Sequence, residues 1–350
     1  MPQPPLHGLR VIETATGISG PYAGRLLASL GAHVIKIEPP DGDPARIQQV
    51  DDTPLGEGEL SPLYIHLNAG KLNVTPDDIE PSWADVVIAG DVLADLENSK
   101  WDPARLRSHD TRLVTTTAWG ADAQDPGCIA DELLVQTATG FLGFNGDQDL
   151  PPLRLPGWQS QYAAGGLASA MVQLIGRTDA SHIDVSWLGA LLTATELCYG
   201  DALHCQRVRP KVGAHPPTAF PSGAIKCKDG HFAPGSIRPI DWEMQCLFYG
   251  LPEWIDDPEL RNRLKRRHHI PMIWDHIEPW YLEREKREIF ELALNSPWAA
   301  GMVMTPLDTL SDPHLSARGY LGAIDTPRGE ATGPIRPFIA PGLPVPDQRV

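Results

Sequence analysis

The stretch from Gly8 to Pro40 constrains the fold of this chain more than any other. Leu9–Ile12 and His33–Ile37 are short apolar runs, and Pro21–Leu30 between them carries leucines at helical spacing. The proline that opens this middle segment suits a first helical turn, and Gly31 after it suits a helix end. Strand, helix and strand in so short a stretch predict a βαβ unit. Such a unit implies a parallel sheet covered by helices.

Three glycines stand where the first strand would turn into the helix. Gly17, Gly20 and Gly24 are spaced three and four residues apart. The dinucleotide-binding fingerprint has a different spacing, in which the second glycine lets the backbone approach a pyrophosphate. Two interpretations therefore stay open, a loop that binds a ligand and a tight turn followed by close helix packing.

Length and charge set limits on the class of protein. A chain of 350 residues can form one large domain or two. The formal net charge of -16 argues against a nucleic-acid-binding protein, which would show a basic face. An anionic small molecule is still a possible ligand, because a few local cations and amide N–H groups suffice to bind it.

The cysteines and the hydropathy pattern indicate the compartment. Cys128, Cys198, Cys205, Cys227 and Cys246 form no CxxC pair and no metal-ligand spacing. We therefore expect free thiols in a reducing compartment and no metal site. The sequence shows no basic-then-apolar leader and no long apolar run, so we expect a soluble, cytoplasmic protein without membrane contact.

The N-terminal stretch also carries a long motif. GLRVIE ends at Glu13, and SGPYAGRLLASLGAHVIKIEPPDGDPAR runs from Ser19 to Arg46. This order resembles the pattern GPxAxxxLAxLGAxVIKxExPxGDxxR of the family III CoA-transferases, a group that includes formyl-CoA transferase, carnitine CoA-transferase and 2-methylacyl-CoA racemase. The resemblance implies an α/β protein with a Rossmann-like large domain, a smaller α+β domain and an interlocked homodimer.

The resemblance covers nearly the whole chain and implies its domain boundaries. It places the large domain in residues 1–200 with 305–350, the small domain in 218–300, and linkers in 201–217 and 301–304. Within the small domain, charged outer faces predict helices over Trp242–Tyr249, Pro258–His268 and Ile273–Leu294.

Family positions near CoA can be carried over residue by residue. A lysine at the end of the second apolar run and a following arginine lie near the CoA phosphates in the family. SPLYIHLNAGKLNV, from Ser61 to Val74, matches the family segment FxxxNRGKRSV at the nucleotide. The resemblance assigns CoA contacts to Ile18, Lys36, Arg46, Asn68, Lys71, Trp119 and Gly120.

Two segments depart from the family pattern. Between Val74 and Trp83 the chain is too short for the usual helix, and Ala89–Leu93 replaces the family loop NFRPG. The second change removes an asparagine and an arginine and introduces Asp91. An anion site that loses a cation and gains a carboxylate should bind a polyphosphate more weakly.

Gln161 stands at the position of the family's catalytic aspartate, directly before Tyr162. In the family this carboxylate attacks the acyl-CoA thioester to give a mixed anhydride. An amide is uncharged and a very poor nucleophile, so it cannot follow that route, and the neighbouring Ser160 would need a base. Gln161 is therefore either a structural residue at a helix start or a neutral hydrogen-bond donor to a thioester or carboxylate oxygen.

The racemase branch of the family uses a histidine and a glutamate as its two bases. Glu132 aligns with a family aspartate, and the preceding Ala130-Asp131 offers no histidine. Arg238 stands at the glutamate position. Two-base proton exchange is therefore disfavoured. Gln161, Glu132 and Arg238 are the candidate catalytic residues, although acids such as Glu132 also suit the first turn of a helix for structural reasons.

Three functions remain open from the sequence. The first is a family enzyme that acts on a CoA thioester, with acyl-CoA or a carboxylic acid as its small-molecule partner and with altered chemistry at Gln161. The second is a non-catalytic subunit that pairs with an active paralogue in a heteromer. The third is an enzyme that has lost CoA dependence and uses another ligand.

Overall fold

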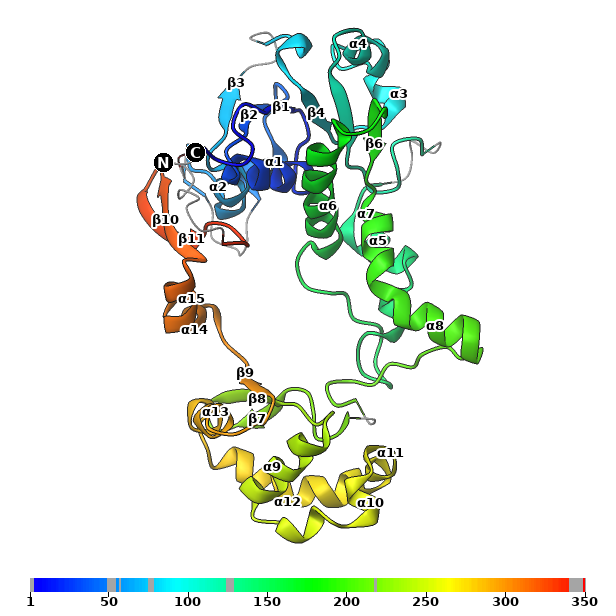
Figure 1. Cartoon of the computed structure of the whole chain (residues 1–350), viewed down its shortest axis with the longest axis vertical. Coiled ribbons are helices and arrows are strands. Elements are labelled where there is room, and N and C mark those ends of the chain that lie inside the picture. The colour runs from blue at the N-terminus through cyan, green and yellow to red at the C-terminus, as the bar shows by residue number, and fades with distance from the viewer. Residues whose placement is uncertain are drawn as a thin grey trace. The chain divides into compact units, whose positions relative to one another are not determined.

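A computed structural model describes residues 3–48, 55–56, 58–74, 79–123, 129–216, 219–339 and 349. The chain divides into two compact units (Figure 1). The first unit comprises Met1–Leu142, Arg154–Val208 and Leu310–Val350, and the second comprises Gly143–Leu153 and Arg209–Thr309.

The first unit contains a six-stranded parallel sheet. Its strands are β1 (Arg10–Glu13), β2 (His33–Ile37), β3 (Leu72–Val74), β4 (Val86–Ala89), β5 (Arg112–Thr115) and β6 (His182–Asp184). The strand order is β3-β2-β1-β4-β5-β6, and each pairing is parallel. This order is that of a doubly wound fold. The predicted α/β class is therefore confirmed.

Helices cover the sheet, and α1 and α6 pack against one another (Figure 1). The helices of this unit are α1 (Ser19–Ser29), α2 (Pro62–Asn68), α3 (Leu93–Leu96), α4 (Pro103–Ser108), α5 (Glu132–Ala138), α6 (Gln159–Ile175), α7 (Trp187–Leu192), α8 (Glu196–Cys205) and α15 (Pro313–Arg318). In the shortened segment before β4, Thr75–Asp78 lie outside the described residues, and Pro81–Trp83 form a single 3-10 turn.

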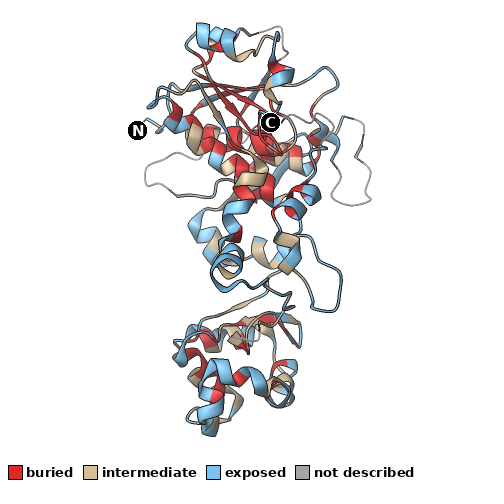
Figure 2. Ribbon diagram, turned by 90° about the vertical axis from the view of Figure 1, so that its right-hand side faces the viewer, coloured by how far each residue is buried: buried red, intermediate tan, exposed pale blue. Residues whose placement is uncertain are grey.

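Successive residues of each strand face opposite sides of the sheet. On one side, Val11 of β1 belongs to a core with Leu27 of α1 and Ala168 of α6. On the other side, Ile12 belongs to a core with Leu96 and Leu106. Both faces are therefore covered, and buried residues gather along the strands (Figure 2).

A hairpin completes the first unit. Its strands β10 (Leu321–Thr326) and β11 (Gly329–Pro334) pair in antiparallel register. Arg25 in α1 donates to the carbonyl oxygens of Pro334 at 3.4 Å and Ile335 at 3.0 Å. Arg328 at the hairpin turn pairs with Glu59. These contacts fix the hairpin to the helical layer.

The second unit contains a three-stranded antiparallel sheet in the order β7-β8-β9 and its own hydrophobic core. Its strands are β7 (Ile225–Cys227), β8 (Gly230–Pro234) and β9 (Ala300–Met302), and its helices are α9 (Pro239–Tyr249), α10 (Pro258–Arg261), α11 (Arg263–Arg266), α12 (Ile270–Leu282) and α13 (Lys286–Leu294). Helix α14 (Pro306–Leu310) lies at the boundary between the units, because Leu310 is the first residue of the C-terminal segment of the first unit.

The single helix predicted over Ile273–Leu294 is wrong, because α12 and α13 are separate there. The turn between β7 and β8 interrupts the helix. The Lys228 N–H donates to the carbonyl oxygen of Arg284 at 3.0 Å, and the Lys286 N–H donates to Asp229 Oδ1 at 2.7 Å. The Arg284 carbonyl oxygen and the Lys286 N–H therefore form hydrogen bonds outside the helix.

Candidate functional site

Asp43 holds the loop between β1 and α1. Gly17 lies in this loop with a φ of 75°, a left-handed value that favours glycine. The N–H groups of Gly17 and Ala45 donate to Asp43 Oδ1 at 3.0 and 2.8 Å. The buried carboxylate therefore ties the loop at the carboxyl end of β1 to the segment that follows β2.

Asp43 belongs to a set of four charged residues, Glu13, Lys36, Asp43 and Lys71, which we call the buried charge cluster. Lys36 Nζ lies 3.1 Å from Glu13 Oε1 and 2.8 Å from Asp43 Oδ2. Lys71 Nζ lies 2.8 Å from Glu13 Oε2. All four side chains are 0% exposed. Two carboxylates balance two ammonium groups, which is the condition under which charges can stay buried.

The two lysines of the cluster differ in their pKa. Burial favours the neutral form of both ammonium groups. For Lys36, the attraction of Glu13 and Asp43 outweighs burial, and its pKa is raised. Lys71 shares Glu13 with Lys36 and is repelled by it, so that burial lowers the pKa of Lys71 to about 8. Lys71 Nζ also donates to the Pro21 carbonyl oxygen at 2.7 Å and to Asn68 Oδ1 at 3.0 Å.

Glycines at the start of α1 make room for this arrangement. A Cβ atom on Gly24 would lie 1.9 Å from Glu13 Oε2, and one on Gly20 would lie 2.2 Å from the Cβ of Ala15. The glycine spacing is therefore explained by a tight turn and close packing of α1, the second of the two interpretations left open by the sequence.

Glu13 and Asp43 are residues that sequence reasoning did not single out. Their signal was present, since Glu13 closes the GLRVIE segment and Asp43 is the aspartate of the family's Gly-Asp step. What the sequence does not show is their common partner Lys36, or that Lys71 comes to Glu13 from a loop far along the chain.

A second network surrounds Arg46 at the rim of the same edge. Arg46 Nε donates to Glu38 Oε2 at 2.6 Å, and the Tyr64 hydroxyl donates to Glu38 Oε1 at 2.5 Å. Burial alone would raise the pKa of Glu38, but these bonds and the Asp43 N–H lower it to about 2. Asn68 Nδ2 donates to the Tyr64 carbonyl oxygen at 3.0 Å. The Arg46 side chain remains 36% exposed.

The remaining predicted CoA contacts lie on two loops. Ile18 is buried and immediately precedes α1. Trp119 and Gly120 follow β5, and Trp119 Nε1 donates to the Ile129 carbonyl oxygen at 3.4 Å. Gly120 has a φ of 118°, which favours glycine. Because β1 and β5 run parallel in one sheet, both loops emerge at its carboxyl edge, where doubly wound folds bind ligands.

Gln161 lies in the first turn of α6 and is 8% exposed. Glu132 of α5 holds this turn, because its carboxylate accepts the Ser160 hydroxyl at 2.6 Å and the Ser160 N–H at 2.9 Å. Gln136 Nε2 donates to the same carboxylate at 2.9 Å, and Gln136 Oε1 accepts the Leu155 N–H at 2.8 Å. Ser160 is 0% exposed. The structure thus joins Glu132 to the turn that carries Gln161.

A comparison with known protein families identifies the family of this chain. The model of CoA-transferase family III matches residues 6–346. The chain belongs to this family. The resemblance carried by the N-terminal motif is therefore confirmed.

Named relatives of this family III chain are CoA-transferases. The succinate–glutarate CoA-transferase of Agrobacterium fabrum is 25% identical over 367 residues, covering 98% of this chain and 91% of the relative. The formyl-CoA:oxalate CoA-transferase of Streptomyces avermitilis is 25% identical over 379 residues, covering 97% and 88%. A crystal structure of a CaiB/BaiF family protein from Brucella suis shares the fold, with a TM-score of 0.84 at 24% identity over 99% of this chain and 96% of that chain.

Arg238 of this family III chain belongs to the second unit. It precedes α9, and its Nη2 atom lies 2.6 Å from Asp241 Oδ1. The Arg238 N–H donates to Asp241 Oδ2 at 3.0 Å, and Nη2 also donates to the Pro297 carbonyl oxygen at 2.9 Å. The pair with Asp241 raises the pKa of the Arg238 guanidinium. A role for Arg238 in catalysis remains a prediction.

Three further features concern the described part of this family III chain. No group of three or more histidine, cysteine, aspartate or glutamate side chains there could hold a metal ion. Cys205, Cys227 and Cys246 are free thiols, and Cys128 lies outside the described residues. No helix among those described has both the length and the apolar character needed to cross a membrane.

Proposed function

We propose that this protein acts on a CoA thioester bound at the carboxyl edge of the six-stranded sheet, with Gln161 contacting the thioester. The observation that carries the proposal is the placement of Gln161 in the first turn of α6, which Glu132 holds through Ser160. Family membership supports CoA as the ligand. The named relatives support an acid, such as a small dicarboxylate, as the second substrate.

The chemistry at position 161 differs from that of an aspartate enzyme. The Gln161 amide cannot attack the thioester carbonyl, so no enzyme-bound anhydride forms at this side chain. Its NH₂ group can donate to the carbonyl oxygen, which gains negative charge when a nucleophile attacks the carbon. An acceptor carboxylate would attack the thioester carbon and expel the CoA thiolate, which leaves a free mixed anhydride. The thiolate would then attack the acceptor's carbonyl carbon in that anhydride, form the new thioester and release the first acid as its carboxylate. With water as the nucleophile, the acid forms and the CoA thiolate takes up the proton.

The predicted CoA contacts divide into two groups in this proposal. Arg46 is the cation that can reach a phosphate, because part of its side chain is exposed. Lys36 supports the site indirectly, since its ammonium group is buried against Asp43, which holds the Gly17 loop. The Lys71 ammonium group is buried against Glu13. Direct contacts from the two lysines, and from Ile18, Asn68, Trp119 and Gly120, remain predictions.

The family also suggests how the chain is organised. We propose that the first unit is the large CoA-transferase domain, that the second is the small domain, and that two copies form an interlocked homodimer in the cytoplasm. A heteromer with a catalytic paralogue is the alternative if Gln161 marks a non-catalytic subunit. Light scattering on the purified protein distinguishes a dimer from a monomer, and co-purification identifies a different partner.

Calorimetry with CoA and acetyl-CoA tests the proposal. We expect micromolar binding to wild type and to Gln161→Asp, and a hydroxylamine-sensitive acyl adduct only on Gln161→Asp. Gln159→Asp is the matched control, since it adds the same carboxylate at an exposed position in the same turn and should give no adduct. If neither wild type nor Gln161→Asp binds CoA, the proposed function fails and the third hypothesis, another ligand, takes its place.

A further inference from the structure

Two cavities lie within the first unit, between α2 and the β10–β11 hairpin and beside α1 and α6. The larger has a volume of about 440 Å³ and lies between the β10–β11 hairpin and α2. Its walls include Leu60, Ile65 and Ile324. The smaller has a volume of about 270 Å³ and reaches α1 and α6. Cavities of several hundred Å³ are of the size that proteins use for small molecules.

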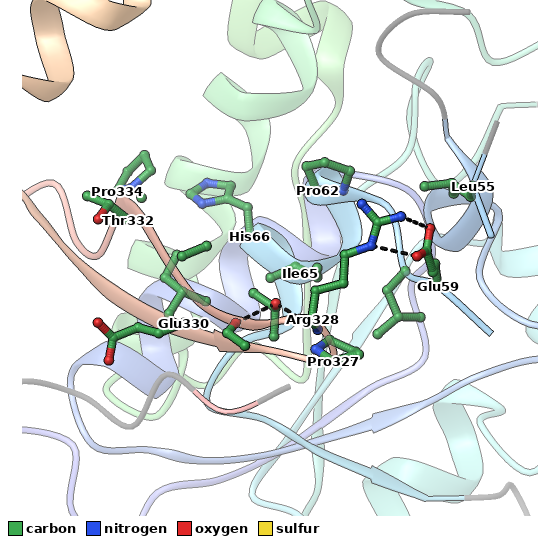
Figure 3. Close-up of a pocket in the computed structure, with 16 residues that line it drawn as sticks. Leu55, Glu59, Pro62, Ile65, His66, Pro327, Arg328, Glu330, Thr332 and Pro334 are labelled. Carbon is green, nitrogen blue, oxygen red and sulfur yellow. Dashed lines mark hydrogen bonds and ion pairs between the residues drawn. The ribbon is translucent and has the colours of Figure 1, made fainter. Parts of the chain in front are cut away.

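The two cavities meet at one point. His66 and Pro334 line both of them. Figure 3 shows these two residues at one end of the larger cavity, while the Glu59–Arg328 ion pair lies at the other end. The two cavities are therefore neighbours on either side of His66 and Pro334.

The smaller cavity has a positive and hydrogen-bonding lining. It contains two arginines, Arg25 and Arg336, and the tyrosines Tyr22, Tyr162 and Tyr320. None of the described residues that line it is a carboxylate. In a chain with a formal net charge of -16, such a lining is a local site for an anion.

Arg25 is the cation nearest to the interior of this site. Only 2% of the residue is exposed, and its Nη1 atom donates to the Ala69 carbonyl oxygen at 2.8 Å. Burial lowers the pKa of Arg25 to about 10, so the guanidinium remains charged at neutral pH. A buried cation attracts an anion strongly, since few water molecules screen it.

The larger cavity has mainly apolar walls, and its lining also includes Glu59, Arg328, Glu330 and His66. At the junction, the pKa of His66 is lowered to about 4 by burial and by Arg25 and Lys71, so that the ring is neutral at pH 7. Its Nδ1 atom is buried and has no hydrogen-bond partner among the described residues. A buried nitrogen of this kind is usually satisfied by water or by a ligand.

We propose that the joined cavities bind an amphipathic monocarboxylate, with its carboxylate beside Arg25, Tyr22 and Tyr162 and its hydrocarbon chain in the apolar cavity under the hairpin. Binding in these cavities needs no CoA. Tyr162 directly follows Gln161 in α6, so an occupied site also contacts the helix that carries the candidate catalytic residue.

Calorimetry with straight-chain carboxylates from hexanoate to dodecanoate, without CoA, tests the inference. Affinity should rise about fourfold for each CH₂ group added until the apolar cavity is full. Decanol lacks the charge and should bind at least tenfold more weakly than decanoate. Because the assay contains no CoA, its result is independent of the proposed function.

Variants separate the two ends of the site. Ile65→Trp fills the apolar cavity and should abolish decanoate binding, whereas Ile237→Trp, at an exposed position of the second unit, should not. Tyr22→Phe should weaken decanoate binding about tenfold with little effect on decanol, and Tyr199→Phe, away from the cavities, should change neither. Thermal unfolding checks that each variant is folded.

Three results would overturn the inference. The first is no binding of decanoate or dodecanoate by wild type at millimolar concentration. The second is equal affinity for decanoate and decanol, which would show an apolar cavity without an anion site. The third is unchanged decanoate binding in a folded Ile65→Trp variant, which would show that decanoate binds outside these cavities.

Discussion

At the scale of single residues, the carboxylate of Glu132 accepts two hydrogen bonds from Ser160 at the start of α6 and one from Gln136 in α5. Glu132→Gln replaces one oxygen by an NH₂ group that must face a donor. We expect the free energy of unfolding to fall by about 1–3 kcal/mol, because a buried donor loses its partner. Urea unfolding measures this change. Ser160→Ala, which removes one of the donors, should cost less, and a larger loss in Ser160→Ala would contradict this account.

The network around Glu38 gives a pH dependence. The pKa of Glu38 is about 2 in the folded protein and 4.5 in an unperturbed carboxyl group. Its stabilising contribution is therefore complete above pH 4.5 and is lost as the pH falls towards 2. Glu38→Gln should lower stability by about 1–2 kcal/mol at pH 7, where Arg46 is partly screened by solvent, and by much less at pH 3.

Denaturant unfolding at the two pH values measures this difference. Glu330→Gln is a suitable control, because this carboxylate is exposed on β11. The control should match wild type at both pH values. A loss of stability in Glu38→Gln that is the same at pH 7 and pH 3 would show that the bonds to Arg46 and Tyr64 are not the cause.

At the scale of elements, the packing of α6 on α1 depends on one of two adjacent glycines. A Cβ atom on Gly165 would lie 2.4 Å from the Ser19 carbonyl oxygen, whereas one on Gly166 would meet no atom within 4 Å. Gly165→Ala should therefore force the helices apart and lower the melting temperature. Gly166→Ala should raise stability by about 0.5–1 kcal/mol through helix propensity. Thermal unfolding of both variants tests the pair, and similar shifts would refute the packing argument.

The helices and strands that have a clear local pattern of apolar residues were predictable. Apolar runs at Leu9–Ile12 and His33–Ile37 flank a leucine stripe, and these signals predict β1, α1 and β2 within two residues of their observed bounds. The break between α12 and α13 was not predictable, because its cause is a backbone contact with the β7–β8 turn. The helical sequence pattern of a segment does not show its contacts with other segments.

For the candidate site, the sequence supplies predicted positions but not their contacts. The family motif gives Lys36, Lys71 and Gln161 their places in the sequence. It does not show that Glu132 bonds Ser160 or that Glu13 meets both lysines, because those partners come from distant segments. Pairing between distant residues depends on tertiary packing, which single-sequence patterns do not encode.

At the scale of the whole molecule, the second unit has a core of its own. Phe232, Trp242, Tyr281 and Trp298 are buried in it. We expect a fragment covering residues 209–309 to fold alone, with one cooperative urea transition followed by tryptophan fluorescence. Trp298→Ala in the fragment should lower stability by about 3–5 kcal/mol. A fragment without a cooperative transition would show that this core needs the Gly143–Leu153 segment or the first unit in order to fold.

The buried charge cluster also limits how this sequence can change during evolution. Replacing Glu13 alone leaves two buried ammonium groups with one carboxylate, a loss of about 3–5 kcal/mol for an uncompensated buried charge. That is a large share of the stability of an ordinary domain. A single substitution at one of these positions therefore lowers stability, and a second, compensating substitution restores it. Glu13 and Lys71, far apart in the chain, should thus be epistatic and be replaced together or not at all.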